Sequence, residues 1–475
     1  MGHDSPQPYP TYKPSGLPWL GEIPAHWEEK RGKYYFREID ERSTTGDEEL
    51  LSVSHLTGVT PRKESVTMFM AESNAGHKRC QPGDLVINTM WAWMAALGVS
   101  RQAGLVSPAY GVYRLCRQDL FQPAYLDYLL RSRSFVAEYM CRSTGIRASR
   151  LRLYPEQFLD IRIPRPPLVE QDAMVRYIRH YDQQVNRFIR NRRRLIEVLN
   201  EQKQGIISRA VTRGLDPDGP LKPPGVDWLG GIPAHWEIKQ LRFLLQGGLS
   251  NGLFKKKDMF GRGTPLVNVK DIYQHDYQVH HCDLERVDAT STECGVFEVA
   301  PGDLFFVRSS LKLEGTGRCA FIDVVPEPTV FECHLVRGRP DSTQVSSRYL
   351  VFLLNSSGIH TSLVSHANTV TMSTLPQGAI ASQRVPVPPT REQAEILRAI
   401  DRDCAPVLAA TTKAQREIDL IHEYRTRLVS DVVTGKVDVR GLASTELLDD
   451  KLAERLLDDK ALIDEEPEPI EEPEG

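Results

Sequence analysis

The chain has 475 residues, of which 40% are hydrophobic, and a formal net charge of −4. This length and composition favour a globular protein of two to four domains. No apolar run approaches the roughly 18 residues that a membrane span needs, and the N-terminal residues lack the pattern of a signal peptide, so we expect a cytoplasmic protein. The eight cysteines are scattered without a C-x-x-C pair, which favours reduced thiols.

An acidic segment at the C-terminus accounts for the negative net charge. Residues 445–475 contain 13 Asp or Glu and three Lys or Arg, which leaves 56 basic and 50 acidic residues in the rest of the chain. A body with a net charge of +6 is compatible with binding to nucleic acid. We expect residues 441–475 to form an acidic, disordered tail.

The sequence contains an internal repeat. Residues 19–27 (WLGEIPAHW) return as 228–236 (WLGGIPAHW), P-G-D-L at 82–85 returns at 301–304, and P-P-x-x-E-Q at 166–171 returns at 388–393. The offset between the copies grows from 209 to 222 within the first part of each copy and then stays constant. Each copy therefore comprises a globular part of variable length and a part of fixed length.

The part of fixed length predicts a long helix in each copy, because hydrophobic residues recur there with heptad spacing. The first helix is expected at about residues 169–212, with a seam of Met174, Ile178, Tyr181, Val185, Phe188, Leu195, Leu199 and Ile206. The second seam comprises Ile396, Ile400, Val407, Ala410, Ala414, Ile421, Tyr424 and Leu428. Because Pro406 lies inside this second helix, we expect a kink or a break near residues 404–405.

Short apolar and alternating runs between turn residues predict strands in the globular parts, with helical segments after them. We therefore predict an α+β fold with two tandem heads, each a mixed, curved β-sheet with helices. The two long helices are expected to join the heads as an antiparallel coiled coil with pseudo-twofold symmetry. The predicted boundaries are 1–168 and 215–389 for the heads, 169–214 and 390–440 for the helices, and 441–475 for the tail.

Two different heads on a rigid coiled coil suit two different half-sites on one DNA duplex. Half-sites must lie near one helical turn apart, roughly 34–36 Å, for both heads to approach the same face of the DNA. A rigid pair of helices would fix that separation.

The repeated motifs resemble one known family. The tandem W-L-G-x-I-P-x-H-W openings, the Pro-rich junctions that end in E-Q and the E-x(5)-[IV]-S-x-x-V-T helix ends at 201–212 and 423–434 are similar to those of the specificity subunit of type I restriction-modification systems. The resemblance covers about residues 15–440. It implies two target-recognition domains that bind a bipartite, asymmetric target on double-stranded DNA.

The same resemblance implies partner subunits that supply the chemistry. Two modification (methyltransferase) subunits would use S-adenosylmethionine, and restriction (translocase-nuclease) subunits would use ATP and Mg²⁺. This chain itself is then expected to be no enzyme and to hold no cofactor or metal. The sequence agrees, because it has no phosphate-binding loop, no adenine methyltransferase motif, and no zinc-ligand spacing around His280, His281 and Cys282.

Candidate DNA contacts are Lys, Arg, Asn, Ser or Thr residues at expected loops and strand ends, because such side chains bind phosphates and base edges. The richest stretch is 142–152, whose counterpart in the second copy is 365–371. The candidates in the first head are Arg62, Lys63, Lys78, Arg79, Arg142, Thr144, Arg147, Ser149, Arg150 and Arg152. Those in the second head are Lys255, Lys256, Lys257, Asn268, Lys270, Arg308, Lys312, Asn368 and Thr369.

Other repeated or clustered residues have different expected roles. The tryptophans Trp19, Trp27, Trp228 and Trp236 are expected to pack each head against a helix end. The arginines at 187–194 form a dense cluster that fits DNA phosphates, a solvated helix face or a surface for an acidic partner, and the sequence does not separate these three.

Two other classes of function remain compatible with the sequence. The chain could be a coiled-coil scaffold that never contacts DNA, in which case it would lack DNA affinity even with modification subunits present. Alternatively, it could be a single-chain DNA methyltransferase or nuclease without a visible motif, and the purified chain would then methylate or cleave DNA alone.

Overall fold

The computed structural model of the chain describes residues 7–62, 73–145, 151–226, 229–369 and 372–442. Two compact units divide the chain: unit one comprises residues 1–192 and 416–475, and unit two comprises residues 193–415. Each unit contains one β-rich head and one segment from each of two long helices, α4 (Leu168–Arg213) and α9 (Thr390–Val433).

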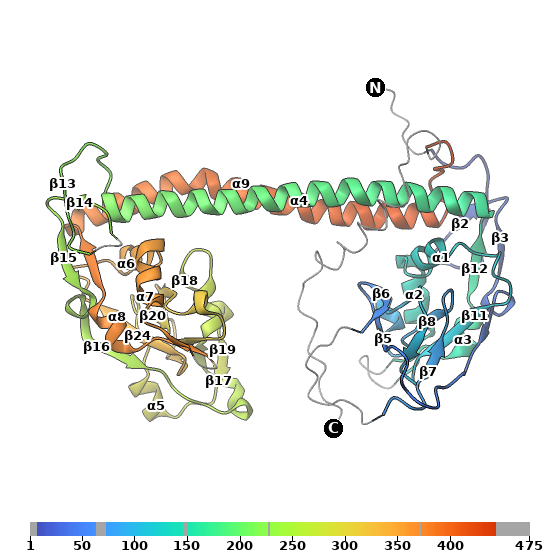
Figure 1. The fold of residues 1–475 in the computed structure, drawn as a ribbon, viewed down its shortest axis with the longest axis horizontal. Coiled ribbons are helices and arrows are strands. Elements are labelled where there is room, and N and C mark those ends of the chain that lie inside the picture. Colours follow the sequence, from blue (N-terminus) through green and yellow to red (C-terminus); the bar gives the residue numbers. More distant parts are fainter. Residues whose placement is uncertain (1–6, 63–72, 146–150, 227–228, 370–371, 443–475) are drawn as a thin grey trace. The chain divides into compact units, whose positions relative to one another are not determined.

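The head of unit one is built on an antiparallel sheet with the strand order β4 (Phe36–Glu38), β11 (Gly111–Leu115), β8 (Leu85–Ile87) and β9 (Leu97–Val99). Figure 1 shows α1 (Pro123–Leu130) and α2 (Arg133–Arg142) between this sheet and the long helices. The smaller elements are β1 (Tyr12–Pro14) paired with β2 (Glu22–Pro24), β3 (Glu28–Arg31) with β12 (Arg162–Arg165), β5 (Leu51–Ser54) with β6 (Gly58–Pro61), β7 (Lys78–Cys80) with β10 (Gly104–Val106), and helix α3 (Pro155–Asp160).

The head of unit two is built on a mixed sheet with the strand order β16 (Leu245–Asn251), β24 (Leu335–Pro340), β20 (Leu304–Val307), β22 (Cys319–Ile322) and β18 (Gln278–Val279). Only its β18–β22 pair is parallel. Two further sheets have the orders β19 (Glu285–Val287), β17 (Phe260–Val267), β23 (Val330–Phe331), and β21 (Ser309–Ser310), β26 (Ser373–Thr374), β25 (Asn368–Thr369). The remaining elements are the pairs β13 (Leu221–Lys222) with β14 (Ile232–Pro233) and β15 (Glu237–Gln240) with β27 (Arg384–Val387), and helices α5 (Ser291–Val296), α6 (Ser347–Leu354), α7 (Ser357–Val364) and α8 (Gln377–Ser382).

Short 3-10 helices connect these elements. They are η1 (Gly32–Tyr34) and η2 (Ala92–Met94) in unit one, and η4 (Leu241–Leu244), η5 (Lys257–Met259), η6 (Val269–Tyr273), η7 (His281–Asp283) and η8 (Leu313–Gly315) in unit two.

The central strands alternate their side chains between two cores, as the period of two in a strand requires. In β20, Leu304 and Phe306 belong to a core that also contains residues of α4 and α9, whereas Phe305 and Val307 belong to a second core on the other face. Unit one also joins its sheet to both long helices in one core, which includes Met174 from α4. Burial of these side chains fixes each head to its own segments of the long helices.

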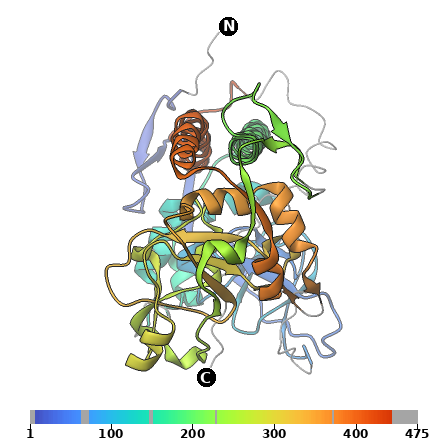
Figure 2. The same cartoon turned by 90° about the vertical axis from the view of Figure 1, so that its left-hand side faces the viewer.

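The long helices run antiparallel where they pack together. In unit one, Asp182 pairs with Arg425 at 2.7 Å and Arg192 with Glu417 at 2.8 Å, so residue numbers rise along α4 as they fall along α9. Figure 2 shows the two helices end-on and side by side. The predicted α+β fold with two β-rich halves and two paired long helices is confirmed, and α4 begins and ends within one residue of the predicted range.

The predicted heptad seam is wrong at Leu195, which is 38% exposed. Tyr424 is 56% exposed, but its ring lies against that of Tyr181 of α4, with 6.0 Å between the ring centroids, so it takes part in the seam as predicted. A straight α-helix has 3.6 residues per turn, so its buried stripe drifts away from a strict 3.5-residue repeat. The neighbouring residue Ile196 is half-buried instead.

Helix α9 continues through Pro406, so the expected break does not occur. Proline lacks the N–H that would bond to the carbonyl of Arg402, four residues earlier. Pro406 and Arg402 both lie on the exposed side of the helix, where water can take the place of that donor. Cys404 and Val407, on the other side, are buried, and this packing holds the helix across the proline.

Across the ranges described above, no helix combines the length and the apolar character that crossing a membrane requires.

Candidate nucleic-acid interface

The repeated motifs anchor each head on a long helix. Glu170, in the first turn of α4, accepts hydrogen bonds from His26 Nε2 (2.6 Å) and Trp27 Nε1 (2.9 Å). In unit two Glu392 of α9 does the same with His235 (2.7 Å) and Trp236 (3.0 Å). The W-L-G-x-I-P-x-H-W and P-P-x-x-E-Q motifs recur together because they bind each other.

The glutamine of each P-P-x-x-E-Q motif binds the backbone of its head. Gln171 Oε1 accepts the N–H of Gln122 at 2.8 Å, and its Nε2 donates to the carbonyl of Pro166 at 2.8 Å. Gln393 makes the equivalent bonds to Ser346 and Pro388, at 2.8 and 2.9 Å. Both glutamines are buried, so these bonds satisfy polar groups that water cannot reach.

The predicted packing role holds for two of the four repeated tryptophans. Trp27 and Trp236 are buried, whereas Trp19 is 52% exposed, so the prediction is wrong for Trp19. Trp228 lies outside the described residues.

The repeated P-G-D-L motif is also structural. Asp84 binds Arg114 through two hydrogen bonds of 2.8 Å, and Asp303 binds Arg339 through two bonds of 2.7 and 3.0 Å. Gly302, before the second aspartate, has a φ of 89°, which L side chains rarely adopt. The motif therefore forms a turn that opens the central strand and buries a paired carboxylate.

In both heads, the loop after the central strand is hydrogen-bonded to the segment that leads into the last short helix. In unit one the N–H of Leu153 donates to the carbonyl of Thr89 at 2.9 Å. In unit two the N–H of Leu375 donates to the carbonyl of Arg308 at 2.8 Å. These residues are related by the repeat offsets of 219 and 222, so one backbone framework presents different side chains in the two heads.

In unit two this framework brings several predicted contacts together. The strands β21, β26 and β25 place Arg308, just before β21, near Asn368 and Thr369 of β25, and both β25 side chains are exposed. Lys312, which is also exposed, lies two residues after the end of β21. The result is an exposed polar cluster with two cations.

Two residues of this cluster were missed by the sequence analysis. Asn251 Oδ1 accepts hydrogen bonds from Arg308 Nη1 at 3.3 Å and from Gln377 Nε2 at 2.7 Å. Asn251 and Gln377 are far apart in the sequence, so only their residue types could have marked them as candidates.

In unit one the corresponding surface contains Thr144 and Arg152. Their backbones exchange two hydrogen bonds of 3.0 Å, and both residues are exposed. Arg152 Nη2 lies 3.9 Å from the sulfur of Met90 in the loop after β8. Ala95, in the same loop, has a φ of 65°, and such strained backbone is often found at functional sites.

Several predicted contacts form ion pairs within the protein instead. Lys78 is buried and lies 3.8 Å from Asp40, and Arg142 binds Glu138 at 2.5 Å and Asp160 at 3.3 Å. Both side chains are therefore engaged within the head. Arg79 is exposed but pairs with Glu48 at 3.1 Å, and Arg62 is exposed.

In the second head too, some of the predicted contacts are paired within the protein and others are exposed. Lys255 pairs with Glu293 at 2.9 Å and Lys270 with Glu285 at 2.6 Å. Asn268 is 9% exposed and donates to Glu285 at 3.1 Å, so its side chain is held inside the head. Lys256 is exposed. Lys63, Arg147, Ser149, Arg150 and the side chain of Lys257 lie outside the described residues.

The arginine cluster on α4 still fits DNA phosphates, a solvated helix face or a surface for an acidic partner. Arg187, Arg190 and Arg193 are exposed, whereas Arg192 pairs with Glu417 and Arg194 pairs with Glu197, each at 2.8 Å.

The chain is similar to three curated proteins over about two thirds of its length. The type I restriction enzyme EcoKI specificity subunit of Escherichia coli (strain K12) is 23% identical over 330 residues, which cover 68% of each chain. The MjaVIII specificity subunit of Methanocaldococcus jannaschii is 21% identical over 340 residues, or 69% of this chain and 73% of that one. The StySPI specificity subunit of Salmonella potsdam is 22% identical over 334 residues and 68% of each chain. This chain belongs to the type I restriction-modification specificity subunits.

The family assignment agrees with the fold. A chain in a solved structure on complex assembly and conformational transition of the type I restriction-modification system superposes on this specificity subunit with a TM-score of 0.56 at 15% identity. The match covers 86% of this chain and 98% of that one. No protein-family profile matches the sequence.

A specificity subunit is a non-catalytic component of a type I complex and directs target recognition. This supports the prediction that the chain is not itself an enzyme, and the chain is part of a type I restriction-modification complex.

Proposed function

We propose that each head of this specificity subunit recognises one half of a bipartite, asymmetric target on double-stranded DNA. The proposal rests on one observation: the two heads share the same backbone framework, but this framework carries different side chains in each head. At the equivalent position of the two frameworks stand Thr89 in unit one and Arg308 in unit two. Heads of one construction and different surface chemistry fit two half-sites of different sequence.

The proposed contacts are the described candidates that remain exposed or half-exposed and that pair with no carboxylate among the described residues, together with the two newly found amides. Arg, Asn and Gln side chains can form the paired hydrogen bonds that distinguish guanine or adenine in the major groove, and Lys binds phosphate or guanine. The proposed set is Arg62, Thr144 and Arg152 in unit one and Asn251, Lys256, Arg308, Lys312, Asn368, Thr369 and Gln377 in unit two.

The chemistry is proposed to come from partner subunits. Two modification subunits that hold S-adenosylmethionine would methylate adenine within the bound target. Restriction subunits that hold ATP and Mg²⁺ would act on unmodified DNA. The specificity subunit would then decide where both activities occur.

The proposal is tested with the subunit in complex with its modification subunits. The bound target is first identified by mapping adenine methylation in cells, and duplexes with substitutions in either half are then compared by fluorescence anisotropy. In the variant Arg308→Ala, affinity for the target should fall about tenfold, and sequence preference should be lost in one half only.

The control variant Arg391→Ala removes an exposed arginine at the start of α9 and should leave both preferences unchanged. Equal affinity of the wild-type complex for target and unrelated duplexes would contradict the proposal and favour a scaffold without DNA contact.

A further inference from the structure

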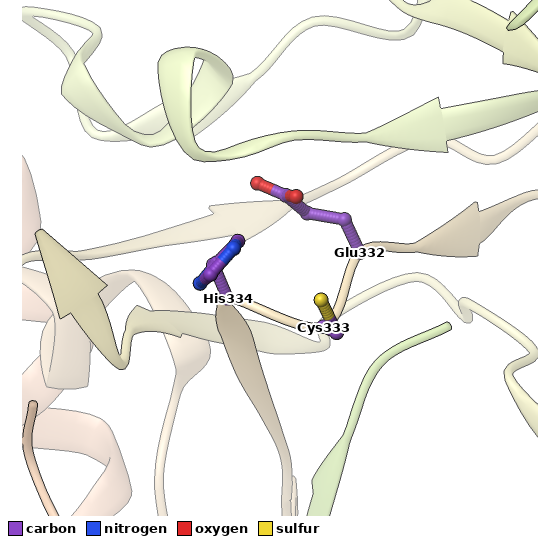
Figure 3. Close-up of side chains that lie close together, drawn as sticks. All are labelled: Glu332, Cys333 and His334. Carbon is purple, nitrogen blue, oxygen red and sulfur yellow. The ribbon is translucent and has the colours of Figure 1, made fainter. Parts of the chain in front are cut away.

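Three consecutive residues of unit two, Glu332, Cys333 and His334, form a turn between β23 and β24. A carboxylate oxygen, the thiol sulfur and an imidazole nitrogen from these residues all lie within 4.8 Å of one another. Figure 3 shows the three side chains directed toward the same side of the turn. Glu332 and Cys333 are half-buried and His334 lies nearer the surface, so a bound ion would be partly shielded and still accessible.

The backbone of this turn is held in place from both sides. The N–H of Glu332 donates to the carbonyl of Val267 at 3.0 Å, and the N–H of Leu335 donates to the carbonyl of Glu332 at 3.1 Å. The carbonyl of His334 accepts the N–H of Arg308 at 2.8 Å. The donor atoms therefore project from a fixed framework, which lowers the entropic cost of binding an ion.

The side chains leave donor atoms free for an ion. Glu332 Oε1 accepts the N–H of Val269 at 2.8 Å, which orients the carboxylate and leaves its second oxygen. Such a bond to a ligating carboxylate is usual around protein metal sites. Cys333 is a free cysteine, and its sulfur lies beside the backbone N–H of its own residue.

The donor types select the ion. Thiolate, imidazole and carboxylate together are the ligands of Zn²⁺, whereas Mg²⁺ and Ca²⁺ prefer oxygen ligands alone. A divalent cation at the site would stabilise the thiolate form of Cys333 directly, because its positive charge lies at the sulfur.

We propose that Glu332, Cys333 and His334 form a zinc site, with the fourth position filled by water. On binding, Zn²⁺ forms bonds to the carboxylate, the imidazole and the sulfur, and the thiol proton is released to solvent. The ion would fix the turn to which the backbone of Arg308 is bonded. The zinc site does not rest on the proposed DNA recognition, because it is argued from donor atoms outside the proposed contacts.

The experiment uses the purified full-length chain, freed of metal with a chelator and titrated with Co²⁺. Cobalt bound to a thiolate gives a charge-transfer band in the near ultraviolet, so the band reports the cysteine directly. One equivalent of Co²⁺ should develop the band, and added Zn²⁺ should remove it.

The band should be lost in Cys333→Ser and retained in Cys282→Ser, which removes an exposed thiol next to two other histidines. His334→Gln should weaken cobalt binding while circular dichroism stays unchanged. A band that is absent from the wild-type chain, or that survives Cys333→Ser, would overturn the proposed site.

Discussion

In both heads, a buried carboxylate at the start of the central strand has an arginine partner. Removal of this carboxylate should lower the stability of the fold. Asp303 has no exposed side-chain surface, and it also accepts the N–H of Ala300 at 2.8 Å. Asp303→Ala would leave Arg339 without this partner, so the free energy of unfolding should fall by about 3 kcal/mol. Urea denaturation measures the change, and the exposed control Asp323→Ala should change stability by less than about 0.5 kcal/mol. Equal effects of the two variants would rule out this role for Asp303.

A buried histidine should make unit two sensitive to acid. Burial, helped by the charge of Arg318, lowers the pKa of His360 from 6.5 to about 4. The unfolded chain therefore binds a proton that the folded chain does not, and stability is lost as the pH falls from about 6.5 toward 4. The loss approaches roughly 3 kcal/mol at the lower end.

The variant His360→Gln should remove this part of the pH dependence, because glutamine can keep a bond to the carbonyl of Thr316 without titrating. Melting temperatures of both proteins between pH 7 and 5 provide the measurement. The exposed control His366→Gln should follow the wild-type curve. If His360→Gln also follows that curve, the histidine is not the titrating group.

Residue type alone could not tell free cations from paired ones. Lys78, Arg142 and Lys270 all stand in basic or polar stretches, but each has a carboxylate partner in the fold. The partners Asp40 and Glu285 lie on other strands or loops, so the pairing depends on strand register and loop geometry. These are tertiary features that a single sequence does not reveal.

At the scale of the elements, each long helix has an equivalent glutamate in its first turn, but the two glutamates have different surroundings. Glu170 also pairs with Arg440 at 3.1 Å, and its side chain is 7% exposed, whereas that of Glu392 is 24% exposed. Glu170→Ala should therefore lower the free energy of unfolding more than Glu392→Ala, by about 1 kcal/mol or more. Urea denaturation of the two matched variants tests this order. A larger loss in Glu392→Ala would contradict it.

The proline within α9 should limit the stability of that helix. In Pro406→Ala, the new N–H can bond to the carbonyl of Arg402, and alanine has a higher helix propensity. The melting temperature should rise, with a gain of up to about 3 kcal/mol. The nearby exposed control Thr412→Ala should have a much smaller effect. A lower melting temperature for Pro406→Ala would mean that the proline fits a bend that α9 requires.

The long helices were the most predictable elements, because the constant offset and the heptad spacing both mark them. The seam was less predictable at Leu195, since a straight helix does not follow the 3.5-residue repeat over its whole length. The repeated motifs predicted a structural role for Trp27 and Trp236, but not the glutamate that binds each of them.

At the scale of the whole molecule, the duplication explains how one chain can address two different half-sites. The buried motifs are the same in both units, so both heads are anchored alike on their helices. The surface loops are free to differ because the backbone bonds at Leu153 and Leu375 do not depend on side chains. The recognised bases follow from the geometry of those loops, which is why the sequence alone could not give them.

The most direct test of two independent heads is an exchange of the first head. Residues 1–168 are replaced by the matching part of another specificity subunit, and adenine methylation is mapped by single-molecule sequencing in cells that also carry the modification subunits. We predict a two-part motif for the original chain and a motif changed in only one half for the exchanged chain. A change in both halves, or no methylation that depends on this subunit, would contradict recognition by two independent heads.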